Sequence, residues 1–384
     1  MPNPSKSGMF RPIIQMTRTL TIMAGISVLC FWFAFNARVE KVSDNFDSKV
    51  QAATRMQEAM NILKLFRMEK GVFVDIENDP NETGLVGAQF SLITTDEGDL
   101  DAKLTTLDPN FAAAMIELLS RAGLTTDDTV AVLLTGSMPG ANMAVLIAAE
   151  TLGINTVAIT SLGASQWGAN YPDFTWLDME AILIEKGMLK NRSIAASIGG
   201  RNDLGRLLSP RGRNLIIQNI EKHSLPLIRA TSLSANIDMR METLFKYGPS
   251  RGYDLMINVG GGVASLGTSF NLKLLNPGLV TRANIEPISR PDGIEGVMVR
   301  FLKSGVNALH ILNISALTDM LQMPYAPIPN PEIGKGPLYA IEQFNLTITF
   351  LCFLIVAGMV FAVGHHSHNQ ISQRMKEHEP DSVL

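Results

Sequence analysis

The chain has 384 residues, of which 46% are hydrophobic and 18% charged, and its formal net charge is −4. An acidic balance of this kind gives no reason to expect binding to nucleic acid, and we expect no nucleic acid among its partners. The length allows one large or two ordinary domains beside membrane segments. Both cysteines, Cys30 and Cys352, fall in long apolar segments, so we expect no disulfide in the rest of the chain.

Two segments with almost no charge are long enough to cross a bilayer, namely residues 13–35 and residues 344–363. Basic residues without acids precede the first segment, which predicts a cytoplasmic N-terminal tail, residues 1–12. A second span then returns the C-terminal tail, residues 364–384, to the cytoplasm. A cleaved signal peptide is the alternative for the first segment. No small-x-small cleavage site follows it, so we favour an uncleaved anchor.

The large segment between the spans is therefore expected outside the cytoplasm, and it divides into three parts. Residues 36–74 contain an amphipathic helix over 44–70, which we interpret as a stalk or docking helix standing off the membrane. Residues 75–323 are expected to form an α/β domain. The Pro-rich run 324–343 is expected to be a linker between this domain and the second span.

The domain is organised around a strand–turn–helix–strand unit. A buried strand is predicted at 129–134, an Ala-rich helix at 141–152 that ends at Gly153, and a second buried strand at 155–160. Such a βαβ unit requires a parallel sheet. Further helices are predicted at 109–122, 176–186, 210–223 and 233–247, and further strands at 86–94, 193–198, 225–229, 254–259, 297–302 and 308–314. This alternation predicts an α/β fold with a doubly wound, mostly parallel, Rossmann-like sheet.

Three loops rich in small and polar residues follow the predicted strands, at the edge where parallel sheets bind ligands. Their candidate ligand-binding residues are Gly136, Ser137, Gly140, Asn142, Ser161, Ser165, Gln166, Asn170, Gly260, Gly261 and Gly262. Ser137 suits either a nucleophile on a sharp turn or a contact to a phosphate or carboxylate. The alternative is that these residues only make tight turns. None of the loops carries a complete dinucleotide or P-loop fingerprint.

Few residues suggest catalysis. Ser137 and Ser165 are the candidate nucleophiles, and Asp178 is a candidate acid or base that alternatively serves only as a favourable charge in the first turn of a helix. No base is evident beside either serine. The segment between the spans contains no HExxH or CxxC spacing, so we expect neither a metal nor a cofactor.

A basic stretch over residues 186–213 contrasts with the acidic composition, because it holds seven basic residues and a single acid, Asp203. We interpret it either as a solvated rim, as a groove that binds a polyanion through arginine forks, or as a contact to lipid head groups. The candidate polyanion-binding residues are Arg192, Arg201, Arg206, Arg211 and Arg213.

Three runs of sequence, TGSMPGANMAVL, SLGASQWGANYPDFTWLDME and DLMINVGGGVASLG, resemble a family of bacterial membrane proteins called poly-γ-glutamate system proteins. The second run is the most distinctive, and the resemblance covers nearly the whole chain. It implies a protein of the bacterial cytoplasmic membrane that takes part in making or exporting poly-γ-glutamate. The implied partners are the anionic polymer and the synthase or export components.

Two classes of function follow from this resemblance. The first is a non-catalytic, membrane-anchored accessory that binds the polymer or the synthase. The second is a serine-type amide hydrolase or transferase that acts on the polymer through Ser137 or Ser165. We favour the accessory, because the sequence shows no base for either serine. A sugar- or nucleotide-binding domain that uses the Gly-rich loops is a third alternative.

Overall fold

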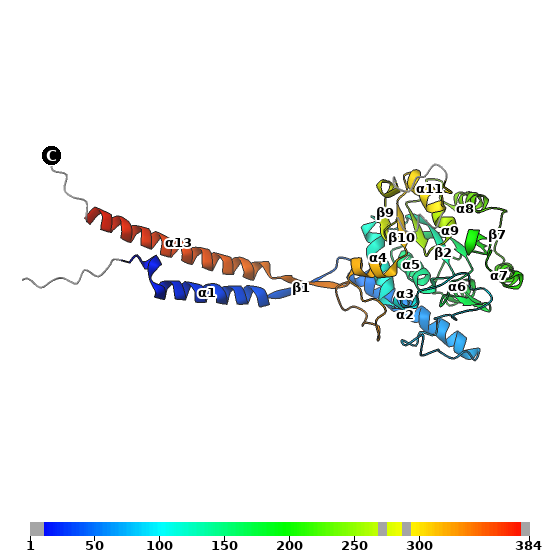
Figure 1. The fold of residues 1–384 in the computed structure, drawn as a ribbon, viewed down its shortest axis with the longest axis horizontal. Helices are drawn as coiled ribbons and strands as arrows, with labels where there is room; N and C mark the ends of the chain where they lie inside the picture. The colour runs from blue at the N-terminus through cyan, green and yellow to red at the C-terminus, as the bar shows by residue number, and fades with distance from the viewer. Residues whose placement is uncertain (1–10, 268–274, 286–292, 378–384) are drawn as a thin grey trace, which may run out of the picture. The chain divides into compact units, whose positions relative to one another are not determined.

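The computed structural model describes residues 11–267, 275–285 and 293–377, and the outer parts of both predicted tails lie outside these ranges. The chain forms two compact units, which we describe separately (Figure 1). The larger unit is Ser43–Tyr339, and the smaller unit combines Met1–Val42 with Ala340–Leu384.

The larger unit is built on a seven-stranded sheet with the strand order β7-β6-β3-β2-β8-β10-β9. All neighbouring strands are parallel except β9, which runs antiparallel to β10 at one edge. The strands are β2 (Thr129–Thr135), β3 (Asn155–Ser161), β6 (Ala195–Ser197), β7 (Leu227–Ile228), β8 (Leu255–Val259), β9 (Gly278–Val280) and β10 (Ala308–Ile311). The predicted α/β class with a mostly parallel sheet is therefore confirmed.

The predicted βαβ unit is present as β2, α5 (Pro139–Thr151) and β3. Every residue of β2 after Thr129 is buried, as a strand covered on both faces requires. Gly153 follows α5 with a φ of +72°, a left-handed conformation that glycine adopts without strain. Local sequence alone therefore predicts this central unit well.

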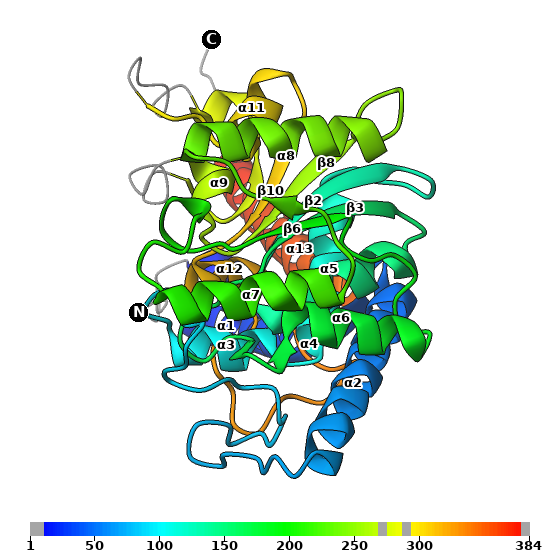
Figure 2. The ribbon, with the colours of Figure 1, turned by 90° about the vertical axis from the view of Figure 1, so that its right-hand side faces the viewer.

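Helices cover both faces of the sheet. Val130, Val132 and Leu134 of β2 pack into one hydrophobic cluster, whereas Ala131 and Leu133 pack into a second cluster on the opposite face. The first face is covered by α2 (Phe46–Glu69), α3 (Leu100–Thr106), α4 (Asn110–Arg121), α5, α6 (Trp176–Glu185), α7 (Pro210–Lys222) and α12 (Ile314–Leu321). The second face is covered by α8 (Leu233–Tyr247), α9 (Val263–Leu266) and α11 (Val297–Lys303). Figure 2 shows these layers on either side of the sheet.

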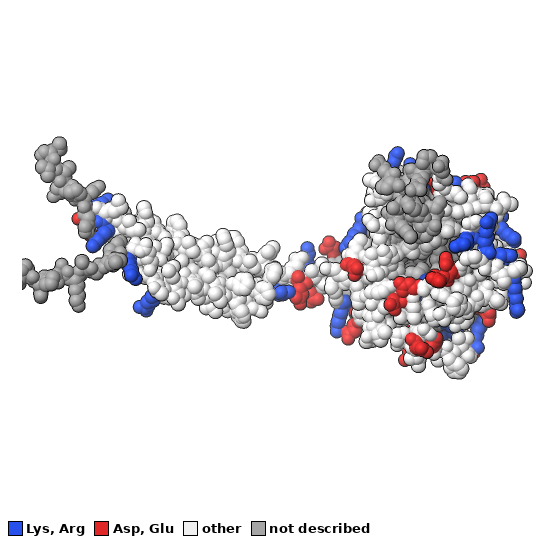
Figure 3. Space-filling model, viewed as in Figure 1, with Lys and Arg blue, Asp and Glu red and all other residues white. Residues whose placement is uncertain are grey.

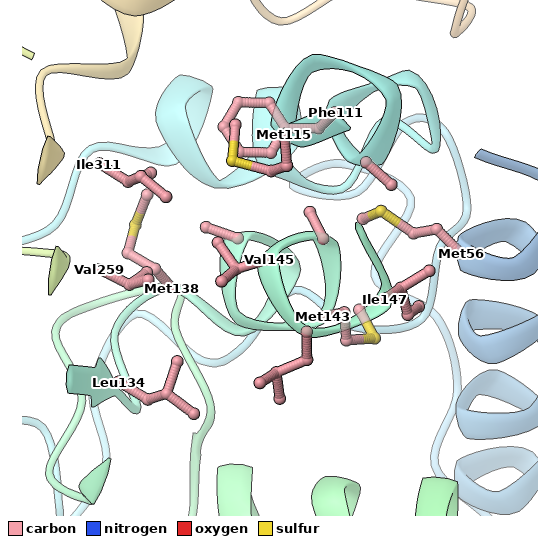
Figure 4. Packing of buried hydrophobic residues seen from close by; sticks show 14 of the residues in the cluster. Met56, Phe111, Met115, Leu134, Met138, Met143, Val145, Ile147, Val259 and Ile311 are labelled. Atoms are coloured by element: carbon pink, nitrogen blue, oxygen red, sulfur yellow. The ribbon is translucent and has the colours of Figure 1, made fainter. Parts of the chain in front are cut away.

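The helix that we interpreted as a stalk, α2, belongs to the core of the larger unit. Its residues Ala52, Met56 and Leu63 are completely buried, and the helix packs on α4 and α5. In Figure 4, Met56 lies beside Ile147 of α5. A helix standing off a membrane would expose this apolar side, so the stalk interpretation is wrong.

The predicted Pro-rich linker also belongs to the larger unit as far as Tyr339. Asn110 of α4 donates from Nδ2 to the carbonyl oxygen of Pro331, at 2.9 Å. Tyr339 is completely buried and donates from its hydroxyl to Asn110 Oδ1, at 2.6 Å. We call residues 324–339 the strap. Because the strap is hydrogen-bonded to the domain, it is not a free spacer.

Two predicted strands are absent. Residues 297–302 form the helix α11 instead, since a short apolar run does not distinguish a buried strand from a buried helix. Residues 86–94 form no strand, and Thr94 makes only an isolated bridge to Ala164. Two short hairpin strands, β4 (Asn170–Tyr171) and β5 (Phe174–Thr175), precede α6.

The smaller unit contains two long apolar helices, α1 (Thr17–Asn36) and α13 (Leu346–Glu377), which pack on each other. Strands β1 (Arg38–Val42) and β11 (Ala340–Phe344) pair in antiparallel fashion beside them. Both helices are long and apolar enough to cross a membrane. Most of their side chains in the apolar part are uncharged and exposed, as Figure 3 shows. The spans predicted at 13–35 and 344–363 thus coincide with helices of suitable length.

Candidate functional site

The carboxyl-terminal ends of β2 and β3 bring two of the predicted loops into contact. Gly136, directly after β2, packs so closely that a Cβ there would lie 2.3 Å from the carbonyl oxygen of Leu162. This close approach allows Ser137 Oγ to accept a hydrogen bond from the backbone N–H of Ser165, at 2.9 Å. The two predicted nucleophiles are therefore neighbours, although they come from different loops.

A lysine that we did not predict as a site residue completes this arrangement. Lys103 of α3 is only 4% exposed, and its Nζ donates to Ser165 Oγ and to Met138 Sδ, each at 3.1 Å. Among the described residues, no carboxylate lies within ion-pair distance of this nitrogen. Burial lowers the pKa of Lys103 to about 8, against an opposing effect of Asp99. About a tenth of this amine is therefore neutral at pH 7, and half of it at about pH 8.

Helix α3 places Lys103 here because it packs tightly against the start of α5. A Cβ on Gly140 would lie 2.3 Å from the carbonyl oxygen of Thr106, at the end of α3. The absence of a side chain at Gly140 thus allows α3 and α5 to pack closely. The sequence signal for Lys103 was slight: a lone lysine in the otherwise uncharged run KLTTL.

Three of the predicted ligand-binding side chains make hydrogen bonds to the backbone of the larger unit. Asn142 donates from Nδ2 to the carbonyl oxygen of Thr135, at 2.9 Å. Gln166 Oε1 accepts from the N–H of Gly98, at 3.2 Å. Asn170 is completely buried and bonds both to the N–H and to the carbonyl of Ala88, at 2.9 and 2.7 Å. The loop after β3 therefore holds the irregular segment 85–99 against the sheet edge.

Ser161 belongs to a different cluster, on the second face of the sheet. It accepts a hydrogen bond from Arg240 Nη2 at 2.9 Å, and the same nitrogen donates to Asp203 Oδ1 at 3.0 Å. Arg240 and Asp203 are 1% and 2% exposed, so the two side chains form a buried ion pair. Ser161 thus supports the loop after β6 and does not join Ser137 and Ser165.

The Gly-rich loop after β8 lies against the end of β2. Gly260 has a φ of +83°, and a Cβ on it would lie 2.6 Å from Thr135 Oγ1. Gly261 is exposed and Gly262 is half-buried. Below this loop, Asn258 Nδ2 lies 2.9 Å from His310 Nδ1, and burial lowers the pKa of His310 to about 4. His310 is therefore a neutral histidine of the interior.

Asp178 is engaged in the structure of α6, as its alternative interpretation proposed. Its carboxylate accepts from the N–H and hydroxyl of Thr175 at the helix start, and from Lys222 Nζ at 2.5 Å. His223 Nε2 lies 2.9 Å from the same carboxylate. Burial alone would raise the pKa of Asp178, but the bonds from His223 and Lys222 hold it well below its usual range. A carboxylate held ionised in this way is a poor general base.

The predicted basic stretch divides between two edges of the sheet. Arg192 precedes β6 and so lies near the amino end of this strand. Arg201, Arg206 and Arg211 follow β6 and are exposed, and Ser165 likewise follows the carboxyl end of its strand, β3. Arg213 is half-buried and donates to the carbonyl oxygen of Leu208 at 2.7 Å. In Figure 3, Lys and Arg gather at the right-hand edge, where Figure 1 places α7 and β7. One groove lined by all five arginines is therefore not formed.

The loop after β6, which begins the arginine group, nevertheless lies against the loop that carries Ser165: the N–H of Gly163 donates to the carbonyl oxygen of Ile198 at 2.9 Å. Cβ atoms on Gly163 and Gly200 would each meet Thr95 Cγ2, at 2.6 and 2.9 Å. Thr95 therefore lies between the loop after β3 and the loop that begins the arginine group. In the described part of the chain, no group of three or more His, Cys, Asp or Glu residues is arranged to hold a metal ion.

Comparison with known proteins identifies no relative: no family model, no curated protein and no solved structure matches this chain.

Proposed function

We propose that this chain is a membrane-anchored serine-type amide hydrolase or transferase in which Ser165 is the nucleophile and Lys103 the general base. The observation that carries the proposal is the 3.1 Å contact between Lys103 Nζ and Ser165 Oγ, made by a buried lysine without a carboxylate partner. A serine becomes a useful nucleophile only when an adjacent base takes its proton, and lysine fills this role in serine–lysine variants of the catalytic triad. The absence of a base was our reason for preferring an accessory.

The reaction would run in two steps. Ser165 Oγ attacks the carbonyl carbon of an amide while its proton passes to the neutral Lys103 amine. The resulting ammonium then gives this proton to the leaving nitrogen as the C–N bond breaks, which leaves an ester on Ser165. Water or an acceptor amine attacks the ester, its proton passes through Lys103 to Ser165 Oγ, and the free enzyme returns.

Ser137 has a supporting part in this proposal. Its Oγ accepts a hydrogen bond from the backbone N–H of Ser165 at 2.9 Å, and this bond holds the backbone of the nucleophile in place. Its own hydroxyl proton has no acceptor within hydrogen-bonding distance among the described residues, so it can donate to the oxygen that becomes negative.

The same proposal includes a Rossmann-like sheet, a location in the bacterial cytoplasmic membrane and a substrate class. Chain order along the parallel strands reverses between β2 and β8, as it does at the switch point of a Rossmann-like sheet. The basic N-terminal residues favour a cytoplasmic N-terminus, and we propose that the two apolar helices span the bacterial cytoplasmic membrane with the larger unit outside the cytoplasm. The substrate class, poly-γ-glutamate, rests only on the resemblance of the three sequence runs.

The test is labelling of the full-length, detergent-solubilised protein with a fluorophosphonate probe, followed by peptide mass spectrometry. We expect the label on Ser165, and we expect Ser165→Ala to lose it while keeping the far-ultraviolet circular dichroism of the parent. Ser209→Ala is the matched control, because Ser209 is an exposed serine that caps α7. A label that persists in Ser165→Ala would refute the assignment. Shortening of poly-γ-glutamate by the labelled protein then tests the substrate class.

A second candidate function is the non-catalytic accessory that binds the anionic polymer and its synthase or export components. It is favoured by Arg201, Arg206 and Arg211, which are exposed and have no acid within ion-pair distance in the described part of the chain. Unpaired arginines at one edge suit carboxylate groups repeated along a polymer.

Binding of poly-γ-glutamate to the full-length protein over a salt series tests this second function. We expect saturable binding that weakens as salt rises and that is lost when the three arginines are changed to glutamine. Lys186→Gln and Lys190→Gln together are the control, since both lysines precede β6 at the opposite edge. Losses in proportion to the three and two charges removed would show that only overall charge matters.

A further inference from the structure

The strap reaches the candidate site. Tyr325 in the strap donates from its hydroxyl to Asp99 Oδ2 at 2.8 Å, and the N–H of Ala326 donates to Thr105 Oγ1 at 2.8 Å. Both acceptors belong to α3 or its first flanking residue, and α3 carries Lys103. A segment that resembles a linker in sequence therefore holds the helix that supplies the base.

Asp99 connects the strap to the start of this helix. Its Oδ1 accepts from the N–H of Ala102 at 3.2 Å, which caps α3, while Oδ2 accepts from Tyr325. The backbone N–H of Lys103 in turn donates to the carbonyl oxygen of Asp99, at 3.3 Å. Asp99 thus fixes the turn from which the lysine side chain begins.

We propose that Asp99 and Tyr325 are positioning residues for Lys103: Asp99 fixes the first turn of α3 and keeps a negative charge near the amine, and Tyr325 holds the Asp99 carboxylate in place. The inference rests on the proposed function for its role in catalysis. The contacts themselves do not depend on that function.

Few other charges face the amine. The atoms nearest to Lys103 Nζ, Ser165 Oγ and Met138 Sδ, are neutral. The helices that pack on α3 are α5, whose first turn carries no charge, and α12, whose Asp319 is exposed. Asp101 on α3 itself is exposed as well. Burial lowers the pKa of Lys103, and the negative charge of Asp99 opposes this effect, so loss of the Asp99 carboxylate should increase the neutral fraction of the amine.

The experiment measures the proton affinity of Lys103 in the full-length protein. Trace acetylation with acetic anhydride over a pH series, read by peptide mass spectrometry, gives the pH midpoint of each lysine separately. Asp99→Ser keeps a capping side chain but removes the charge, and we expect it to lower the midpoint of Lys103 by about one pH unit. Asp101→Asn is the matched control on the same helix, and we expect no shift.

Tyr325→Phe is expected to raise the midpoint, because the tyrosine proton offsets part of the negative potential of Asp99. The same change in an Asp99→Ser background is expected to have no effect, since the coupled carboxylate is then gone. If Asp99 were merely structural, its loss would admit water to α3 and raise the midpoint. A rise in Asp99→Ser, or equal effects of Tyr325→Phe in both backgrounds, would overturn the proposal.

The outcome separates this inference from the proposed function. If Ser165 resists the fluorophosphonate probe while the midpoint of Lys103 shifts as expected, the enzyme assignment fails and the positioning of Lys103 stands. If Ser165 is labelled at the same rate and with the same pH dependence in parent, Asp99→Ser and Tyr325→Phe, the positioning role fails and the enzyme assignment stands.

Discussion

Lys103 Nζ and Ser165 Oγ lie 3.1 Å apart although the two residues are separated by 62 positions in the chain. Helix α3 supplies the lysine and the loop after β3 supplies the serine, and neither segment contains a recognisable catalytic motif. A buried lysine without an acidic partner is costly for a fold, because its charged form loses solvation without gaining an ion pair. This cost supports a chemical role for the amine.

The first prediction concerns the pH dependence of Ser165. If neutral Lys103 is the base, the rate of fluorophosphonate labelling rises with pH and levels off above about 8, the pH at which half of the amine is neutral. Lys103→Met keeps the length and the contact with Met138 but removes the base. We expect it to lower the labelling rate by at least about a hundredfold, the usual contribution of general base catalysis.

A rate that stays high in Lys103→Met, or that does not change between pH 6 and 9 in the parent, would contradict a role for the amine as base. Thermal unfolding of Lys103→Met serves as the folding control. Because the variant no longer buries a charge, we expect its midpoint to equal or exceed that of the parent.

A second prediction tests the packing that brings α3 to the site. Gly140→Ala places a Cβ 2.3 Å from the Thr106 carbonyl oxygen, so the two helices must separate. We expect a loss of about 1–3 kcal/mol in the free energy of unfolding in urea and a lower labelling rate of Ser165. Gly123→Ala is the control, because its Cβ meets no atom and only its φ of +78° is unfavourable. A smaller loss in Gly140→Ala than in this control would refute the close approach.

Sequence reasoning succeeded where structure depends on nearby residues. The unit β2–α5–β3 and the helix α8 were predicted from apolar period, glycine and capping residues, which act within one or two turns. The helix predicted at 210–223 is present as α7, and Ser209 caps it by accepting from the N–H of Gly212 at 3.1 Å. These signals are local, so no knowledge of the tertiary fold was needed.

The sequence-based predictions failed where contacts between segments far apart in the chain determine the structure. The apolar side of α2 fits a stalk or a core helix equally well, and only its packing on α4 and α5 distinguishes them. Prolines in the strap suggested a linker, although its carbonyls are bonded to Asn81 and Asn110. Of the candidate site, the sequence drew attention to both serines, which the structure shows to be neighbours. It did not draw attention to Lys103, because nothing near this residue in the sequence predicts contact with Ser165.

A third prediction concerns the orientation of the spans. We expect a cysteine at position 73 to lie outside the cytoplasm and one at position 373 to lie inside it. Phe73 is 92% exposed, and Gln373 lies in the last part of α13 and is exposed, so both sites are accessible to a reagent. In a background that lacks Cys30 and Cys352, Phe73→Cys should react with a membrane-impermeant maleimide on intact spheroplasts. Gln373→Cys should react only after permeabilisation. The reverse pattern would overturn the assignment from basic flanking residues.

The last prediction concerns stability and pH. Glu180 of α6 accepts from the N–H and the hydroxyl of Ser193, at 3.0 and 2.9 Å, and burial raises its pKa to about 7 from an ordinary value of 4.5. The folded protein therefore binds the Glu180 proton more tightly than the unfolded chain does. The stabilisation that the protonated Glu180 carboxyl gives to the folded state is fully present below about pH 4.5 and is lost as the pH rises through about 7.

Glu180→Gln should flatten this dependence, because glutamine cannot ionise. Between pH 4.5 and 7 the parent should lose up to about 3 kcal/mol more than the variant, at roughly 1.4 kcal/mol per pH unit. Asp108, whose pKa burial raises to about 6, adds a loss of the same sign in both proteins, so it cancels in the comparison. Asp178 contributes in the opposite direction but only below pH 4, because its pKa is held under its ordinary value of 3.8. Urea unfolding across this range measures the difference, with exposed Glu185→Gln on the same helix as the control. Parallel curves for the parent and Glu180→Gln would show that the Glu180 carboxyl titrates alike in the folded and unfolded states.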